Sequence, residues 1–343
     1  MDSLKTSNSS ASEAKIKAGL TAGLDDDSER AKAFRKDAEQ GDEIAQFNLG
    51  VSYELGKGVP QDYAEAAKWY LKAAEKELSE AQYRLGFLIE KGMGVSQDYG
   101  EAVKWYLKAA EKDHPDAQFY LGLMYEDGRG VTQDHSQAAK LYLKAAEKDL
   151  PEAQFNLGRS YLLGLGVPID YSEAVKWFLK AAEKDIPKAQ FNLGVSYELG
   201  NGVPQDYGEA AKWYTKAAEL GYPQAQYRLG LAYSNGQGVS QDHAQAAKWY
   251  QMAAEQGVSS AQLNLGIYYK QGRGVSKNFA EAVKWYRRAA EQGDSQAQYN
   301  LGVSYANGDG VPKNNVMAAL WFRKAHGQGF PLSEEASEIM NKY

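Results

Sequence analysis

Residue types that commonly carry chemistry are present in this sequence, but their spacing does not gather them into a reactive site. Paired glycines such as Gly56 and Gly58 could form a phosphate-binding loop. A dinucleotide-binding loop, however, follows a strand and needs a third glycine. The pairs here follow a helical pattern and lack that glycine, so we interpret them as turns.

The histidines and carboxylates give no metal or acid–base site either. The histidines are His114, His135, His243 and His326. They are widely spaced along the chain, whereas a metal site needs several ligands in one place. Carboxylates such as Glu75 recur beside lysines such as Lys72, a pattern typical of a solvated, ion-paired helix face. The sequence therefore predicts no catalytic residue, no cofactor and no metal, and we expect a protein that is not an enzyme.

The composition excludes several classes of partner. The chain has 343 residues, a formal net charge of −6 and no cysteine. Because there is no excess of positive charge, we expect no binding to nucleic acid. No apolar stretch is long enough to insert into a membrane. The absence of cysteine also excludes disulfides and thiolate metal sites.

The first residues bear on location. Residues 1–25 are rich in Ser, Thr and Asn at their start and are predicted to be disordered or weakly helical. They lack the apolar run of a secretory leader. If Met1 is the native start, we expect a cytoplasmic protein, and secretion by a signal-independent route stays open. If the sequence has been trimmed, this inference does not hold.

The whole chain is organised by an internal repeat. Ala-Gln pairs recur every 36 residues, at Ala45, Ala81, Ala117, Ala153, Ala189, Ala225, Ala261 and Ala297. Eight repeats therefore cover residues 45–332 without insertion or deletion. We number the positions of each repeat from its Ala, which is position 1. Such an array grows by stacking, so we expect one continuous core and not several separate domains.

Each repeat predicts two helices. In the first repeat, Ala45, Leu49 and Tyr53 recur at helical spacing, and Gly56 ends this first helix, helix A. Asp62, followed three residues later by Glu65, is a capping-box pattern that begins the second helix, helix B. No segment alternates with a period of two, so no strand is expected.

Two residue types at fixed positions indicate how the helices pack. All seven tryptophans share position 25, which indicates core packing. Gly50 and its equivalents at position 6 lie inside helix A, where glycine costs about 1 kcal/mol relative to alanine. We interpret them as points of close approach, with the alanines of helix B as the small partners.

The two ends of the array differ from its middle. Residues 26–44 match the second half of a repeat but replace several apolar positions by polar ones, so they are predicted to be an N-terminal capping half-repeat. Residues 333–343 are predicted to form a C-terminal capping helix.

These residues carry a family resemblance. Leu49-Gly50, Tyr53, Gly56 and Gly58-Val59, followed by the Lys-Trp-Tyr run at residues 68–70, resemble the SEL-one-like repeat, a relative of the tetratricopeptide repeat. The resemblance implies an all-α fold, a right-handed α/α superhelical solenoid of helix-turn-helix repeats, with helix A lining the concave groove. It also implies an adaptor. Units one to four depart from the pattern at position 33, where Glu77 and its equivalents replace a frequent glycine.

An enzymatic alternative comes from the same resemblance. A cysteine-rich group of these proteins from a gastric bacterium is described as penicillin-binding with β-lactamase activity. That group relies on a disulfide in each repeat, and this chain has no cysteine. The Ser-x-x-Lys spacing of such enzymes occurs at Ser12–Lys15, without the accessory motifs. β-Lactamase-like activity is therefore the less favoured interpretation.

Positions 4, 8 and 11 of helix A vary between repeats, and the resemblance places this stripe on the groove. We predict that a protein or peptide partner binds there. The candidate residues are Asn48, Ser52, Arg84, Leu88, Tyr120, Met124, Asn156, Ser160, Asn192, Ser196, Arg228, Asn264, Tyr268 and Asn300.

The predicted function is a protein–protein interaction scaffold or adaptor, expected to be a monomer. A structural spacer without a specific ligand is the alternative, because the repeats are nearly identical and length alone would suit that role. The variable stripe favours the scaffold.

Overall fold

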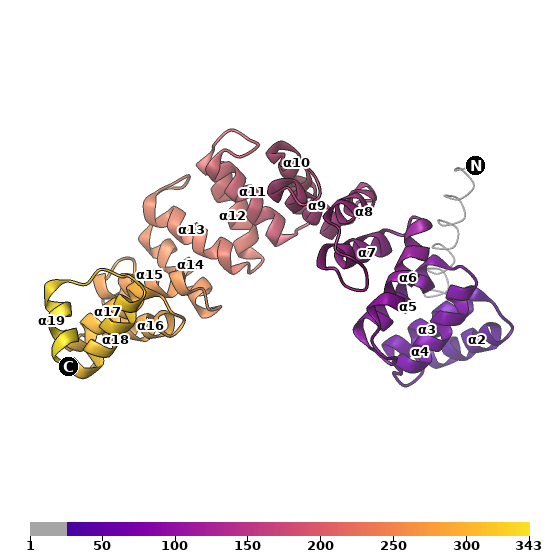
Figure 1. Cartoon of the computed structure of the whole chain (residues 1–343), viewed down its shortest axis with the longest axis horizontal. Helices are drawn as coiled ribbons and strands as arrows, with labels where there is room; N and C mark the ends of the chain where they lie inside the picture. The colour runs from indigo at the N-terminus through magenta and orange to yellow at the C-terminus, as the bar shows by residue number, and fades with distance from the viewer. Residues whose placement is uncertain (1–25) are drawn as a thin grey trace. The chain divides into compact units, whose positions relative to one another are not determined.

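The computed structural model describes residues 26–343, and the part it describes contains eighteen helices and no strand (Figure 1). The all-α prediction is confirmed. The N-terminal segment predicted to be disordered or weakly helical, residues 1–25, lies outside the described residues. The helices are α2 (Asp27–Glu39), α3 (Glu43–Leu55), α4 (Tyr63–Glu75), α5 (Ser79–Lys91), α6 (Tyr99–Glu111), α7 (Pro115–Asp127), α8 (His135–Glu147), α9 (Pro151–Leu163), α10 (Tyr171–Ala182), α11 (Pro187–Leu199), α12 (Tyr207–Glu219), α13 (Pro223–Asn235), α14 (His243–Glu255), α15 (Ser259–Gln271), α16 (Phe279–Glu291), α17 (Ser295–Asn307), α18 (Asn315–Gly327) and α19 (Glu334–Lys342).

The helices form a solenoid, as the repeat predicted. The odd-numbered helices from α3 to α17 are the helices A, and the even-numbered helices from α4 to α18 are the helices B. The described part of the chain divides into two compact units, residues 26–177 and 178–343, and the boundary lies within α10. From α2 to α9, and again from α11 to α19, each helix packs on the helices directly before and after it. A core built from such neighbour contacts is typical of repeat proteins.

The predicted helix ends follow from local chemistry. Helix α3 ends at Gly56, whose φ of 66° is left-handed, and α4 begins after Asp62, whose carboxylate accepts the N–H groups of Ala64 and Glu65. The capping-box prediction is confirmed for the Asp. The Glu65 carboxylate contacts Lys68 at 2.5 Å. The ion pair on this helix B thus forms two turns earlier than the predicted pairing of Glu75 with Lys72, and Lys72 lies over the Trp69 ring at 3.8 Å.

In repeats one to three and five to eight, the glycine at position 6 packs against the aromatic ring at position 26. A Cβ atom added to Gly122 would lie 2.7 Å from the ring of Tyr142, and one added to Gly230 would lie 2.6 Å from the ring of Tyr250. Both tyrosine side chains are buried. The prediction of a close approach is therefore confirmed, but its partner is corrected: the ring of helix B occupies the space, and not the small alanines.

The glutamine of each Ala-Gln pair ties a repeat to the one before it. The Nε2 atom of Gln46 donates to the carbonyl of Ala38 at 3.1 Å, and Gln82 donates in the same way to Ala74. All eight equivalents make this bond and are buried. Each bond adds a side-chain donor to a carbonyl in the last turn of the helix before it, which also accepts the backbone N–H of position 33, as the Ala74 carbonyl does from Glu77 at 3.0 Å.

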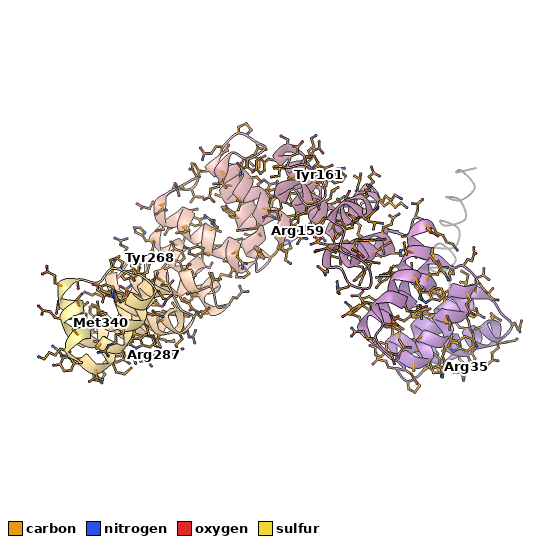
Figure 2. All side chains as sticks on the ribbon, viewed as in Figure 1. Arg35, Arg159, Tyr161, Tyr268, Arg287 and Met340 are labelled. Atoms are coloured by element: carbon orange, nitrogen blue, oxygen red, sulfur yellow. The ribbon has the colours of Figure 1, made fainter. Side chains whose placement is uncertain are left out.

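Position 33 ends helix B in the same way whether it holds glycine or not. Gly221 has a φ of 85° and Glu77 has a φ of 67°, and Asp113, Asp149 and Asp185 are also left-handed. The departure from the family pattern therefore leaves the helix ends unchanged. At the C-terminus, α19 packs on α18 through Ala336. Arg323 donates to the carbonyl of Met340 at 2.7 Å, and Met340 is labelled in Figure 2.

We predict opposite effects for two glycine substitutions in the same compact unit. Gly122→Ala should lower the free energy of unfolding by about 1–3 kcal/mol, because the new methyl group overpacks the buried Tyr142 ring. Gly100→Ala should raise it by up to about 1 kcal/mol, because Gly100 lies inside α6 and its added Cβ would meet only Asp98, at 3.4 Å. Urea denaturation followed by circular dichroism measures both. A loss of stability in Gly100→Ala equal to that in Gly122→Ala would contradict the ring-packing explanation.

Candidate functional site

The structure divides the predicted stripe into buried and accessible positions. Position 8 is buried in every repeat; Leu88, for example, is 1% exposed. Position 11 is exposed in every repeat. The buried candidates are Asn48, Ser52, Leu88, Met124, Asn156, Ser160, Ser196 and Tyr268. Their assignment to an open surface is corrected by this burial: position 8 faces the helix B of the preceding repeat.

The remaining candidates are partly exposed. They are Arg84, Tyr120, Asn192, Arg228, Asn264 and Asn300, all at position 4. Residues at positions 4 and 11 of one helix A are seven residues apart, so they lie on the same face. We call the side chains at positions 4 and 11, other than the buried Asn48 and Asn156, the accessible stripe.

The accessible stripe adjoins a set of charged hydrogen-bond networks that were not predicted from the sequence. The hydroxyl of Tyr106 donates to Glu90 at 2.8 Å, and Arg129 of the next repeat binds the same carboxylate at 3.3 Å. We call this arrangement a Tyr–Glu–Arg triad. The other triads are Tyr70–Glu54–Arg84, Tyr142–Glu126–Arg159 and Tyr214–Glu198–Arg228.

The arginine of a triad reaches its glutamate from different places. Arg84 and Arg228 lie at position 4, Arg159 lies at position 7, and Arg129 lies in the loop after α7. Figure 2 marks Arg159, which pairs with Glu126. Each triad joins a tyrosine and a glutamate of one repeat to an arginine of the next. It therefore links neighbouring repeats by charge-assisted hydrogen bonds.

A sequence signal for the triads exists. Glutamate at position 10 occurs only in repeats whose position 26 is tyrosine, and in repeat eight Ala306 and Phe322 replace both partners. The converse does not hold in repeats six and seven, where Ser234 and Lys270 replace the glutamate although position 26 is tyrosine. In repeat seven the buried hydroxyl of Tyr286 has no hydrogen-bond partner among the described residues. The pattern reflects the free-energy cost of leaving a buried hydroxyl unpaired.

Burial and the nearby carboxylate both raise the pKa of the triad tyrosines. For Tyr106, burial and then the charge of Glu90 raise the pKa well above its usual range. For Tyr214, burial and then the hydrogen bond to Glu198 do the same. These hydroxyls therefore stay protonated and act as donors to glutamate at physiological pH.

One triad forms the floor of a pocket of about 180 Å³ between α12 and α13. A small side chain at position 8 leaves this space open: Ala232 does so here, and Ser52 lines the equivalent cavity of about 150 Å³ between α2 and α3. The lining residues are Glu198, Tyr207, Ala210, Ala211, Tyr214, Arg228, Leu231, Ala232, Asn235 and Gln237. Arg228 and Asn235 belong to the accessible stripe, so the pocket lies directly beside it.

The histidines and carboxylates do not assemble a metal site in the part of the chain that is described. Residues 26–343 contain no group of three potential metal-binding side chains, and no helix among them is long and apolar enough to cross a membrane. His114 is a buried structural residue. Its Nδ1 caps α7 by accepting the N–H of Ala117, and its Nε2 lies 2.6 Å from Glu80.

The triads predict different changes in stability for two tyrosine-to-phenylalanine substitutions. Tyr106→Phe should lower the free energy of unfolding by about 1–3 kcal/mol, because Glu90 loses a buried donor. Tyr286→Phe should be neutral or stabilising by up to about 1 kcal/mol, because it removes an unpaired hydroxyl. Thermal and urea unfolding measure both variants. Equal destabilisation by the two substitutions would show that the triad hydrogen bond contributes nothing.

Comparison with known proteins agrees with this geometry. The Sel1 repeat, which is the SEL-one-like repeat, matches residues 44–78, 79–114, 115–150, 151–186, 187–222, 223–258, 259–294 and 295–329. A search among curated proteins finds no match.

Two solved structures resemble the chain over most of its length. One is a protective antigen of uropathogenic Escherichia coli strains that displays an SLR fold, with 39% identity and a TM-score of 0.84 over 87% of this chain. The chain spans only 64% of that protein. The other is a Sel1 repeat protein from Oxalobacter formigenes, with 34% identity, a TM-score of 0.69 and coverage of 95% of this chain and 93% of that protein. The chain belongs to the Sel1 repeat family.

Proposed function

We propose that this protein is a non-catalytic, monomeric scaffold that binds a protein or peptide partner along the accessible stripe of its A helices. The observation that carries the proposal is the contrast between neighbouring positions of helix A. Positions 5 and 6 are Leu and Gly in all eight repeats, while the exposed position 11 changes. Its residues are Leu55, Lys91, Asp127, Leu163, Leu199, Asn235, Gln271 and Asn307.

The chemistry of the accessible stripe suits a peptide. The amides of Asn192, Asn264 and Asn300 can each donate and accept hydrogen bonds with an extended backbone. The arginines at position 4 add a second type of contact, because arginine is enriched at interfaces. Leu199 is 59% exposed at the end of α11, although leucine is usually buried in folded proteins. Amides, arginine and exposed leucine together offer both polar and apolar contacts.

The family supports the same conclusion. Proteins built from Sel1 and tetratricopeptide-like repeats generally act as protein-interaction scaffolds. Repeat arrays bind along extended surfaces that run from one repeat to the next. The spacer function is the competing interpretation, and it requires that the accessible stripe bind nothing.

The proposal predicts a defined result in a peptide selection. Random peptides displayed on phage should be enriched on the immobilised full chain, and synthetic copies should bind it in solution. Leu199→Asp should weaken this binding by about tenfold or more, because it replaces an exposed apolar contact by a charge, at a cost of about 1.4 kcal/mol or more. Fluorescence anisotropy with labelled peptides measures the change in Kd.

A matched control lies in the same compact unit. Leu220 is 49% exposed at the end of α12, outside the accessible stripe. Leu220→Asp should leave peptide binding unchanged while introducing the same charge. Equal losses in the two variants would place binding away from the accessible stripe, and a selection that enriches no peptide would favour the spacer.

A further inference from the structure

We propose that the pocket between α12 and α13 binds the side chain of a tyrosine in the partner protein. The inference rests on the proposed function, because it names the chemical anchor that the accessible stripe would receive. The pocket has equivalents at two other interfaces of this chain, where the same space is filled by a side chain of the protein itself.

The first comparison is with the interface between repeats one and two. That interface has the same triad, formed by Glu54, Tyr70 and Arg84, and the same pair of alanines on helix B. Its position 8 is Leu88, which is 1% exposed and packed in the core. At repeats five and six the triad and the alanines recur, but position 8 is Ala232. The pocket is therefore the space that Leu88 fills elsewhere.

The second comparison shows that this space accepts a tyrosine. At the next interface, between repeats six and seven, position 8 is Tyr268, a buried residue labelled in Figure 2. Its ring packs edge-to-face on Tyr250, with centroids 5.3 Å apart. Its hydroxyl donates to Ser234 Oγ at 2.7 Å. Ser234 and Tyr250 occupy the positions that Glu198 and Tyr214 occupy at the pocket.

The floor of the pocket provides an acceptor for the incoming hydroxyl. Glu198 accepts the Tyr214 hydroxyl through Oε2 and contacts Arg228 through Oε1 at 3.1 Å. A carboxylate offers about four lone-pair sites, so capacity remains for one more donor. The Glu198 and Arg228 side chains are both partly exposed, and Asn235 and Gln237 at the rim are exposed. A partner side chain can therefore reach the floor from solvent.

The same floor discriminates between related side chains. A phenylalanine would cover Glu198 without replacing its lost water contacts, which costs binding free energy. A phosphotyrosine would bring its negative charge against the Glu198 carboxylate, and like charges repel. Unmodified tyrosine fits both the apolar walls and the acceptor.

The test uses p-cresol, which is the tyrosine side chain without its backbone, and toluene, which is the phenylalanine equivalent. Full-length protein labelled with ¹³C at alanine methyl groups is titrated with each compound. We expect p-cresol to shift the methyl signals of Ala210, Ala211 and Ala232 in a saturable way. Toluene should bind about tenfold more weakly, because it cannot donate to a carboxylate.

Two reciprocal substitutions serve as controls. Ala232→Leu reproduces the Leu88 packing and should abolish the p-cresol shifts at Ala210 and Ala211; Ala232→Met, which copies Met124 at the same position, is the second choice if the first variant does not fold. Leu88→Ala should open the equivalent pocket and create a new p-cresol site at Ala66 and Ala67. p-Cresol should then raise the Tm of Leu88→Ala more than that of the wild type.

The outcomes separate this inference from the proposed function. The absence of p-cresol shifts in the wild type, their persistence in a folded Ala232→Leu variant, or equal binding of toluene would each overturn the tyrosine pocket. Peptides that bind the accessible stripe, but bind equally well after Tyr→Phe replacement and to Ala232→Leu, would also overturn it while leaving the scaffold intact. If p-cresol binds but the selection enriches no peptide, the result would support the tyrosine pocket and contradict the scaffold function.

Discussion

The structure depends on the contact between the glycine at position 6 and the aromatic ring at position 26. At Gly122 a single methyl group would come within 2.7 Å of the Tyr142 ring, so the two helices of a repeat can approach only where helix A lacks a side chain. This contact buries the ring completely and fixes where its hydroxyl points. The helix pair then has a constant geometry, and Gln46 and its equivalents join one pair to the next through a carbonyl in the last turn of helix B. An unbroken period of 36 residues is the consequence.

Burial of the ring creates a second constraint, because a buried hydroxyl needs a partner. In four repeats the partner is a glutamate at position 10, and that carboxylate in turn needs positive charge, which an arginine of the next repeat provides. The arginine comes from position 4, position 7 or the loop after helix A, so its place in the sequence matters less than the place its guanidinium reaches. Such a polar network links repeats with directional contacts, whereas apolar stacking alone leaves their relative rotation less defined. Tyr286, with its unpaired hydroxyl, marks a repeat where this link is missing.

Variation between the repeats is confined to positions that these constraints leave free. Position 11 lies in solvent and accepts leucine, lysine, aspartate or asparagine. Position 8 lies between repeats and accepts side chains from alanine to tyrosine, because a change of volume there alters the interface without touching the glycine–ring contact. Ala232 is one extreme of that range and leaves a pocket, while Tyr268 is the other and fills the same space. A uniform scaffold can therefore acquire a local binding site through a single small residue.

The sequence by itself determined the all-α solenoid, the ends of its helices and the need for a close approach at position 6. Each of these follows from local chemistry that repeats exactly: an N-capping Asp62, a left-handed Gly56 and a constant spacing of apolar residues. It could not decide which of positions 4, 8 and 11 is accessible, because all three lie on one side of helix A. Only packing against the preceding helix B buried Leu88 and Met124 and left Leu199 in solvent. The triads and the pocket were likewise decided by the tertiary structure, since they join residues about 30 positions apart whose proximity depends on how two repeats stack.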